Sequence, residues 1–160
     1  MKTIRIKDVV RQTMVAAIYV EFVLLFQFMS FEVVQFRIAE VLLILIFFDR
    51  RSIWGLSIGT FLANWMLSPF GLVDAIVGML ATVLALGLML IFKKRSIIAL
   101  IFPAITNGLI VGYMVAYIYD ISFMETAAWV FFGEFVVLYV LGLPLYLLLR
   151  NNRDFQELFS

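Results

Sequence analysis

Charged and amide side chains interrupt the apolar stretches that make up most of this 160-residue sequence. Placing a charged group in a helix inside a bilayer costs about 2.5–3.5 kcal/mol, so such groups usually face a partner or a ligand cavity. The chemistry open to them is binding, because carboxylate and amide oxygens accept hydrogen bonds while amides and arginine donate them. The candidates are Glu21, Gln27, Gln35, Arg37, Glu40, Asn64, Asp74, Asn107 and Glu134.

Structural interpretations stay open for the residues near helix ends. Arg37 and Glu40 are three residues apart and could pair on one helix face. Asp74 and Asn64 stand where helices are expected to begin and end, and could cap them. Such roles are compatible with binding and do not exclude it.

The deeper residues are harder to explain without a ligand. Asn107 could satisfy backbone groups beside Pro103. Glu134 lies about 16 Å along its expected helix from the outer end, at 1.5 Å per residue. Glu21 has no evident helical partner, and could face either a cavity or a neighbouring subunit.

Catalysis is not expected. The sequence has no cysteine and no histidine, which removes thiolate chemistry and the commonest acid–base group and metal ligand. Residues 55–59 fit the Gly-x-Ser-x-Gly pattern of serine hydrolases, but that pattern needs a base beside the serine. No phosphate-binding loop of an ATPase occurs. We therefore expect no enzyme activity, no cofactor and no metal site.

The elements that position these residues must be membrane helices. The sequence is 65% hydrophobic and 14% charged, with a mean hydropathy of +1.10, whereas soluble domains are about 45–50% apolar and about 25% charged. A bilayer-spanning helix needs about 20 mostly apolar residues. We predict one all-α integral membrane domain, residues 1–160, in which the second and third of six spans could instead form one buried hairpin. The predicted spans are residues 12–29, 36–48, 53–67, 72–92, 97–119 and 126–149.

Basic residues predict the orientation, since Lys and Arg gather in short cytoplasmic loops. With an even number of spans, eleven of the twelve Lys and Arg residues fall on one side, which predicts two cytoplasmic termini in a multi-pass protein of the bacterial plasma membrane. Arg37 is the exception, on the outer side. The polar candidates then lie mainly in the outer half, which suits an outward-open cup better than a pore.

Several segments, in the expected order along nearly the whole chain, resemble the QueT family. They contain the same outer-half polar residues that the cost of burial in lipid selects. The matching segments are Val34–Glu40, Gly59–Asn64, Gly71–Thr82, Thr106–Gly112, Gly133–Phe135 and Leu141–Leu145.

Small residues four apart favour close helix packing. They occur at positions 55 and 59, 81 and 85, and 108 and 112, and we expect them to pack within the bundle.

The resemblance implies the substrate-binding S component of an energy-coupling factor (ECF) transporter. Such a component would take up a 7-deazaguanine precursor of queuosine, 7-aminomethyl-7-deazaguanine or queuine, with a transmembrane coupling subunit and two cytoplasmic ATPases as partners and no nucleic acid. Which carboxylate would bind the base and which the aminomethyl group is left open. The substrate-binding residues would be Gln35, Phe36, Arg37, Glu40, Asn64, Asp74, Asn107 and Glu134.

The first span departs from the S-component pattern. S components commonly carry an Ala-x-x-x-Ala patch there for docking the coupling subunit, but Val20 follows Ala16 by four residues. Thr13 and Ala17 give a small pair instead, so Thr13, Ala16 and Ala17 are the predicted docking residues.

Other functions stay open on the sequence alone. The chain could be an S component for another vitamin or nucleobase, or a structural membrane subunit that binds no ligand. It could also be a secondary transporter, which would drive uptake without ATPase partners.

Overall fold

The protein is described here by a computed structural model that covers residues 5–30 and 35–158. Within these ranges the regular structure is entirely helical, as predicted, and contains no strand. The elements are α1 (Ile6–Leu25), α2 (Gln27–Ser30), η1 (Ile38–Phe47), α3 (Ser52–Leu67), α4 (Leu72–Ile91), α5 (Ser96–Ala99), α6 (Ile101–Tyr119), α7 (Phe123–Val136), η2 (Val137–Gly142), α8 (Leu143–Leu149) and α9 (Arg153–Leu158).

Each predicted span corresponds to one or more of these helices. The first span is divided into α1 and α2 at Phe26, and the fifth into α5 and α6 at Leu100. The sixth runs without interruption through α7, η2 and α8. The short helix α9 was not predicted.

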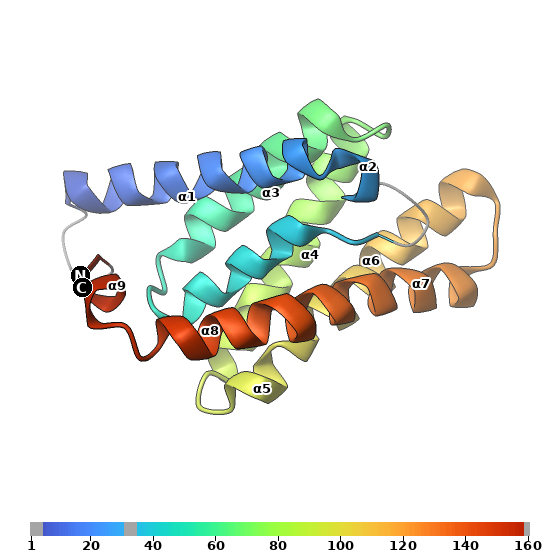
Figure 1. Cartoon of the computed structure of the whole chain (residues 1–160). Helices are drawn as coiled ribbons and strands as arrows, with labels where there is room; N and C mark the ends of the chain where they lie inside the picture. The colour runs from blue at the N-terminus through green and yellow to red at the C-terminus, as the bar shows by residue number, and fades with distance from the viewer. Residues whose placement is uncertain (1–4, 31–34, 159–160) are drawn as a thin grey trace.

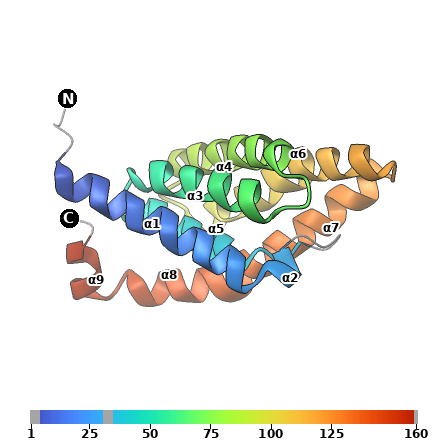
Figure 2. The ribbon, with the colours of Figure 1, turned by 90° about the horizontal axis from the view of Figure 1, so that it is seen from above.

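The helices form a bundle with two distinct ends (Figure 1). The start of α1, the turns before α3 and α5, and α9 lie toward the left and bottom of the view, whereas α2 and the turns that follow α3 and α6 lie toward the right and top. Packing follows chain order, with α1 on α3, α3 on α4, α4 on α6, and α6 on α7. Figure 2 shows α1 alongside α3, and α4 beside α6.

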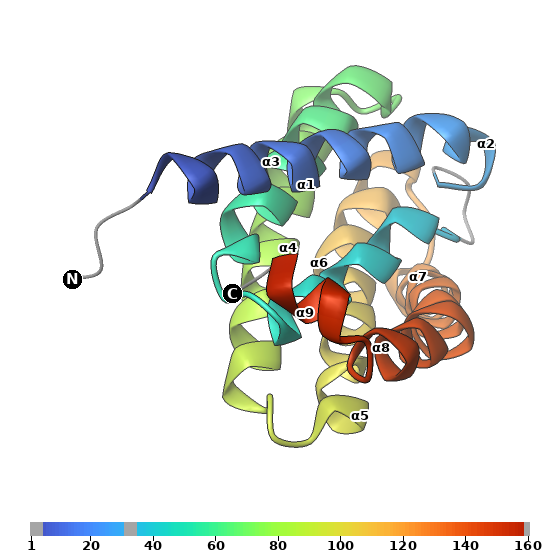
Figure 3. The same cartoon turned by 60° about the vertical axis from the view of Figure 1, so that its left-hand side comes forward.

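Helix η1 is the central element of the bundle, as Figure 3 shows. It contacts α1, α3, α4 and η2, and eight of its ten residues are buried. It is a 3₁₀ helix, and η2 is a π-helical stretch. Long 3₁₀ runs are uncommon, and π-helical stretches frequently occur at functional sites. These two irregular elements pack against each other directly after the polar residues that begin η1 and end α7.

Small residues allow the helices to approach closely, as predicted from their spacing. A Cβ atom on Gly59 of α3 would lie 2.9 Å from Cβ of Tyr19 in α1. One on Gly112 of α6 would lie 2.9 Å from Cα of Ala127 in α7. These glycines therefore serve packing within the chain.

Three helical stretches of the described residues are long and apolar enough to cross a membrane. They are Leu72–Ile91, Ser96–Tyr119 and Phe123–Leu149. Helix η1 is apolar but shorter, and α3, with 16 residues, extends about 24 Å at 1.5 Å per residue. The hydrocarbon core of a bilayer is about 30 Å thick, so η1 and α3 are the shortest members of the predicted set of spans.

A charged network joins the start of α1 to the turn before α3. Asp8 forms an ion pair with Arg51, and Arg11 Nη1 lies 3.2 Å from Oδ2 of Asp49. Gln12 donates to the same Asp49 oxygen at 3.2 Å. Two of the basic segments used to predict orientation thus lie side by side at one end of the bundle.

Candidate functional site

Contacts among Arg37, Asp74 and Asn64 join the start of η1, the start of α4 and the end of α3. The Arg37 guanidinium Nη2 lies 3.6 Å from Oδ2 of Asp74, and both side chains are almost fully buried. Asn64 Nδ2 donates to the backbone carbonyl of Asp74 at 3.2 Å and lies 3.5 Å from its Oδ1. Helix α4 begins without a side-chain cap, so Asp74 does not cap it.

Glu40 is held by a tyrosine of α1. The Tyr19 hydroxyl donates to Glu40 Oε1 at 2.5 Å, and neither residue has any exposed surface. Tyr19 was not among the residues predicted from the sequence. The sequence feature that could have identified Tyr19 is its spacing. It lies four residues from both Val15 and Val23 on the buried face of α1, and it is the only one of these three residues with a hydroxyl group.

A third contact joins α6 to α7. Asn107 Nδ2 donates to Glu134 Oε1 at 3.1 Å, and both side chains are buried. The expectation that Asn107 serves the backbone beside Pro103 is wrong, because its amide nitrogen donates to a side chain and its Oδ1 accepts no hydrogen bond from the described residues. Asn107 is directed instead at the carboxylate.

Gln35 and Phe36 lie just before η1. Gln35 is buried and Phe36 is half-buried. The backbone of Gln35 lies so close to Gly133 of α7 that a Cβ there would overlap the Gln35 carbonyl oxygen. Glu134 follows Gly133 directly, so this approach brings the segment before η1 against the turn of α7 that carries Glu134.

Charge interactions join these contacts into one group. Arg37 interacts electrostatically with Glu40 and Glu134 as well as with Asp74, and Glu40 and Glu134 also interact with each other. We call this group the buried polar cluster, and every member except Tyr19 was predicted from the sequence. It comprises Tyr19, Gln35, Arg37, Glu40, Asn64, Asp74, Asn107 and Glu134.

Four acceptor atoms of the cluster have no hydrogen-bond donor among the described residues. They are Oε2 of Glu40, Oε2 of Glu134, Oδ1 of Asn107 and Oε1 of Gln35. A buried polar atom left unpaired costs about 1–3 kcal/mol, and more when it is charged. The cluster is therefore prepared to accept hydrogen bonds from a ligand rich in N–H groups.

Two of the polar residues singled out in the sequence lie outside the cluster. Glu21 is exposed on the surface of α1 and does not line the groove between α1 and α3. Gln27 donates to the backbone carbonyl of Leu67 at 3.0 Å and so joins α2 to the end of α3.

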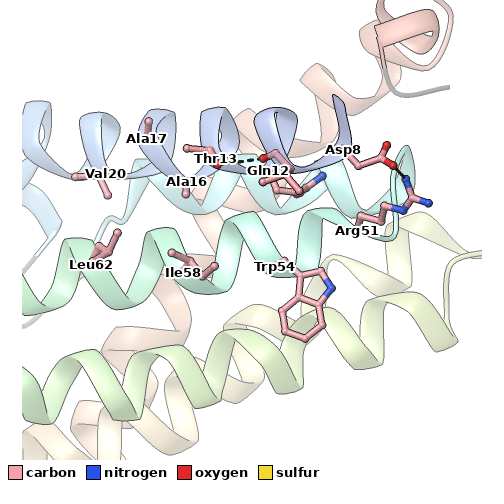
Figure 4. Close-up of a pocket in the computed structure, with 11 residues that line it drawn as sticks. Asp8, Gln12, Thr13, Ala16, Ala17, Val20, Arg51, Trp54, Ile58 and Leu62 are labelled. Carbon is pink, nitrogen blue, oxygen red and sulfur yellow. Dashed lines mark hydrogen bonds and ion pairs between the residues drawn. The ribbon is translucent and has the colours of Figure 1, made fainter. Parts of the chain in front are cut away.

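A separate groove of about 600 Å³ lies between α1 and α3 (Figure 4). Its walls include Thr13, Ala16 and Ala17, the three predicted docking residues. The side chains of α3 that face them include Ile58 and Leu62, while Asp8 and Arg51 lie at one end. None of the lining residues belongs to the buried polar cluster, so the groove and the cluster are distinct sites.

Fold and site together define a helical membrane protein with a polar cluster buried among apolar helices. The family model described as QueT transporter matches residues 9–151, and the chain belongs to this family. Neither the curated proteins nor the solved structures contain a match. QueT is a family of transporters and not of enzymes, and with the apolar helices it indicates a role in membrane transport.

Proposed function

We propose that this protein is the substrate-binding S component of an ECF importer, and that the buried polar cluster binds a 7-deazaguanine precursor of queuosine. The observation that carries this proposal is the set of four buried acceptors without donors. The pairing edge of a guanine-like base carries an N–H and an amino group as neighbouring donors. Glu134 Oε2 and Asn107 Oδ1, on two side chains that are already hydrogen-bonded to each other, form a suitable pair of acceptors for that edge.

The charges of the cluster favour a cationic ligand. Among its buried side chains are three carboxylates, Glu40, Asp74 and Glu134, and a single guanidinium, that of Arg37. Buried charges are tolerated when they are paired. An aminomethyl group, protonated at neutral pH, supplies the missing positive charge, and the five N–H donors of arginine suit the carbonyl of the base.

Calorimetry on the purified protein tests this assignment. We expect 7-aminomethyl-7-deazaguanine to bind more tightly than guanine, because only the former carries an ammonium group; queuine, measured on the same sample, shows which precursor is preferred. Equal affinities for guanine and the aminomethyl base would contradict the role of charge. No binding of any of the three would contradict the proposed substrate class.

We also propose that the chain crosses the membrane six times with both ends in the cytoplasm of a bacterial cell. The positions of the basic segments support this topology. The start of α1, the turns before α3 and α5, and α9 gather at one end of the bundle, and eleven of the twelve Lys and Arg residues lie in or next to these segments. The cluster is then nearer the opposite, extracellular end, from which substrate would enter.

The partners of this proposal are a transmembrane coupling subunit and two cytoplasmic ATPases. The groove between α1 and α3 supports docking of the coupling subunit, because its walls combine the small residues Thr13, Ala16 and Ala17 with apolar side chains of α3. Small residues allow a second membrane helix to approach closely. The chain itself has no ATP-binding motif, so energy for release must come from such partners.

A bulky residue in the groove should separate docking from substrate binding. We expect Ala17→Phe to abolish co-purification of the coupling subunit when the complete transporter is co-expressed, because Ala17 is exposed and lines the groove. Substrate affinity of the isolated protein should be unchanged. Leu84→Phe, at an exposed position of α4, is the control and should co-purify normally; normal co-purification of Ala17→Phe would exclude this groove as the docking site.

A further inference from the structure

Tyr19 joins α1 to the buried polar cluster. Among the described residues, it is the only side chain of α1 that forms a hydrogen bond with a carboxylate of the cluster. Its ring is fully buried, and its hydroxyl lies 2.5 Å from Glu40 Oε1. The close approach of Gly59 to its Cβ fixes the base of the side chain against α3. The hydroxyl therefore has a defined position relative to η1, from which Glu40 extends.

Glu40 and Glu134 are held in the same manner, on different sides of the cluster. One oxygen of each accepts a hydrogen bond from a neutral donor, the Tyr19 hydroxyl or the Asn107 amide. The second oxygen of each is buried and has no donor. A neutral donor orients a carboxylate and leaves its charge in place, whereas a cation would orient the carboxylate and also neutralise its charge. Each side chain thus keeps one directed oxygen for a ligand.

We propose that Tyr19 is a positioning residue of the binding site, which holds Glu40 so that its second oxygen, Oε2, receives an N–H or ammonium donor of the ligand. This inference rests on the proposed substrate-binding function and extends it to a residue outside the segments that carry the family resemblance. Tyr19 acts through Glu40. The loss of its hydroxyl should therefore lower affinity only while Glu40 is present as a carboxylate.

A double-mutant cycle on the full-length protein tests the proposal, with calorimetry of 7-aminomethyl-7-deazaguanine as the readout. We expect Tyr19→Phe to lower affinity about tenfold, the usual effect of removing a hydrogen bond to a charged group. The double variant Tyr19→Phe/Glu40→Gln should bind within about twofold of Glu40→Gln alone, because non-additivity is the signature of residues that act as one unit. Wild-type affinity of Tyr19→Phe, or losses that multiply in the double variant, would overturn the proposal.

Tyr139→Phe is the matched control. Its hydroxyl donates to the backbone carbonyl of Ile97 at 2.6 Å, away from the cluster. Removing this hydroxyl deletes a short tyrosine hydrogen bond and should leave ligand affinity unchanged. An equal loss in Tyr19→Phe and Tyr139→Phe would show a general effect on folding and overturn the positioning role.

Glu40→Asp keeps the test decisive if Tyr19→Phe does not fold. Aspartate retains the charge but is one methylene shorter, so it draws the carboxylate away from the Tyr19 hydroxyl. We expect an affinity loss of about tenfold, and wild-type affinity would overturn the proposal. If the wild-type protein binds none of the bases, the proposed function fails together with this inference. If the wild-type protein binds a base and Tyr19→Phe and Glu40→Asp bind it with wild-type affinity, only this inference fails.

Discussion

Replacing Glu134 by glutamine is expected to lower the affinity for a cationic 7-deazaguanine base by about 100-fold, the largest effect of any single substitution in the cluster. Glu134 has no exposed surface, and its Oε2 is one of the acceptors without a donor. Removing one member of a buried, hydrogen-bonded charge pair costs about 2–5 kcal/mol. Glutamine keeps the size of the side chain and removes the charge, so the loss reports on charge recognition. Calorimetry with the aminomethyl base measures it.

Glu125→Gln is the control for this variant. Glu125 lies in the first turn of the same helix, α7, but is exposed. Its substitution changes the net charge of the protein by the same amount and should leave affinity unchanged.

The variants Glu134→Gln and Glu125→Gln also distinguish a transporter from a structural subunit that binds no ligand. A structural subunit would show altered stability in Glu134→Gln and no ligand affinity to lose, even in the wild type.

The residues of the cluster could be selected from sequence because lipid makes polar side chains costly. Arg37 stood out twice, as a charge within an apolar stretch and as the one basic residue on the outer side of the predicted topology. Glu134 stood out by its depth. Both conclusions depend only on the position of a side chain along the chain, which the sequence contains.

The pairing of these residues could not be predicted, because it depends on how helices pack. Three residues of separation allowed Arg37 to pair with Glu40, and the structure shows an ion pair between Arg37 and Asp74 in α4. Glu40 is hydrogen-bonded to Tyr19 in α1. Local spacing gives the partners within one helix, whereas in the folded protein η1 is surrounded by other helices and its polar groups meet theirs.

The irregular helices were also beyond sequence reasoning. The segment Ile38–Phe47 is apolar apart from Glu40 and contains no glycine or proline that would interrupt an α-helix. It is buried on nearly all sides, so it lacks the one-sided apolar pattern that identifies a helix on the surface of a bundle. Its conformation follows from contacts with α1, α3, α4 and η2, which the sequence does not reveal.

The second large effect is expected from a single methyl group at Gly133. In Gly133→Ala the added Cβ would overlap the backbone carbonyl oxygen of Gln35, and a backbone atom cannot move aside as a flexible side chain can. The segment that leads to Arg37 must then shift. We expect a loss of stability of about 1–3 kcal/mol, the usual cost of overpacking, and weaker ligand binding. Thermal unfolding in detergent and calorimetry measure the two effects.

Gly87→Ala makes the prediction specific to this contact. Gly87 lies in α4, and a Cβ there would meet no atom within 4 Å. Alanine is favoured over glycine inside a helix by about 0.5–1 kcal/mol, so this variant should be at least as stable as the wild type. The same preference for alanine in a helix applies at position 133 of α7. Equal stability of the two variants would therefore show that α7 and the segment before η1 do not approach closely, and the arrangement of Gln35, Arg37 and Glu134 in one cluster would be wrong.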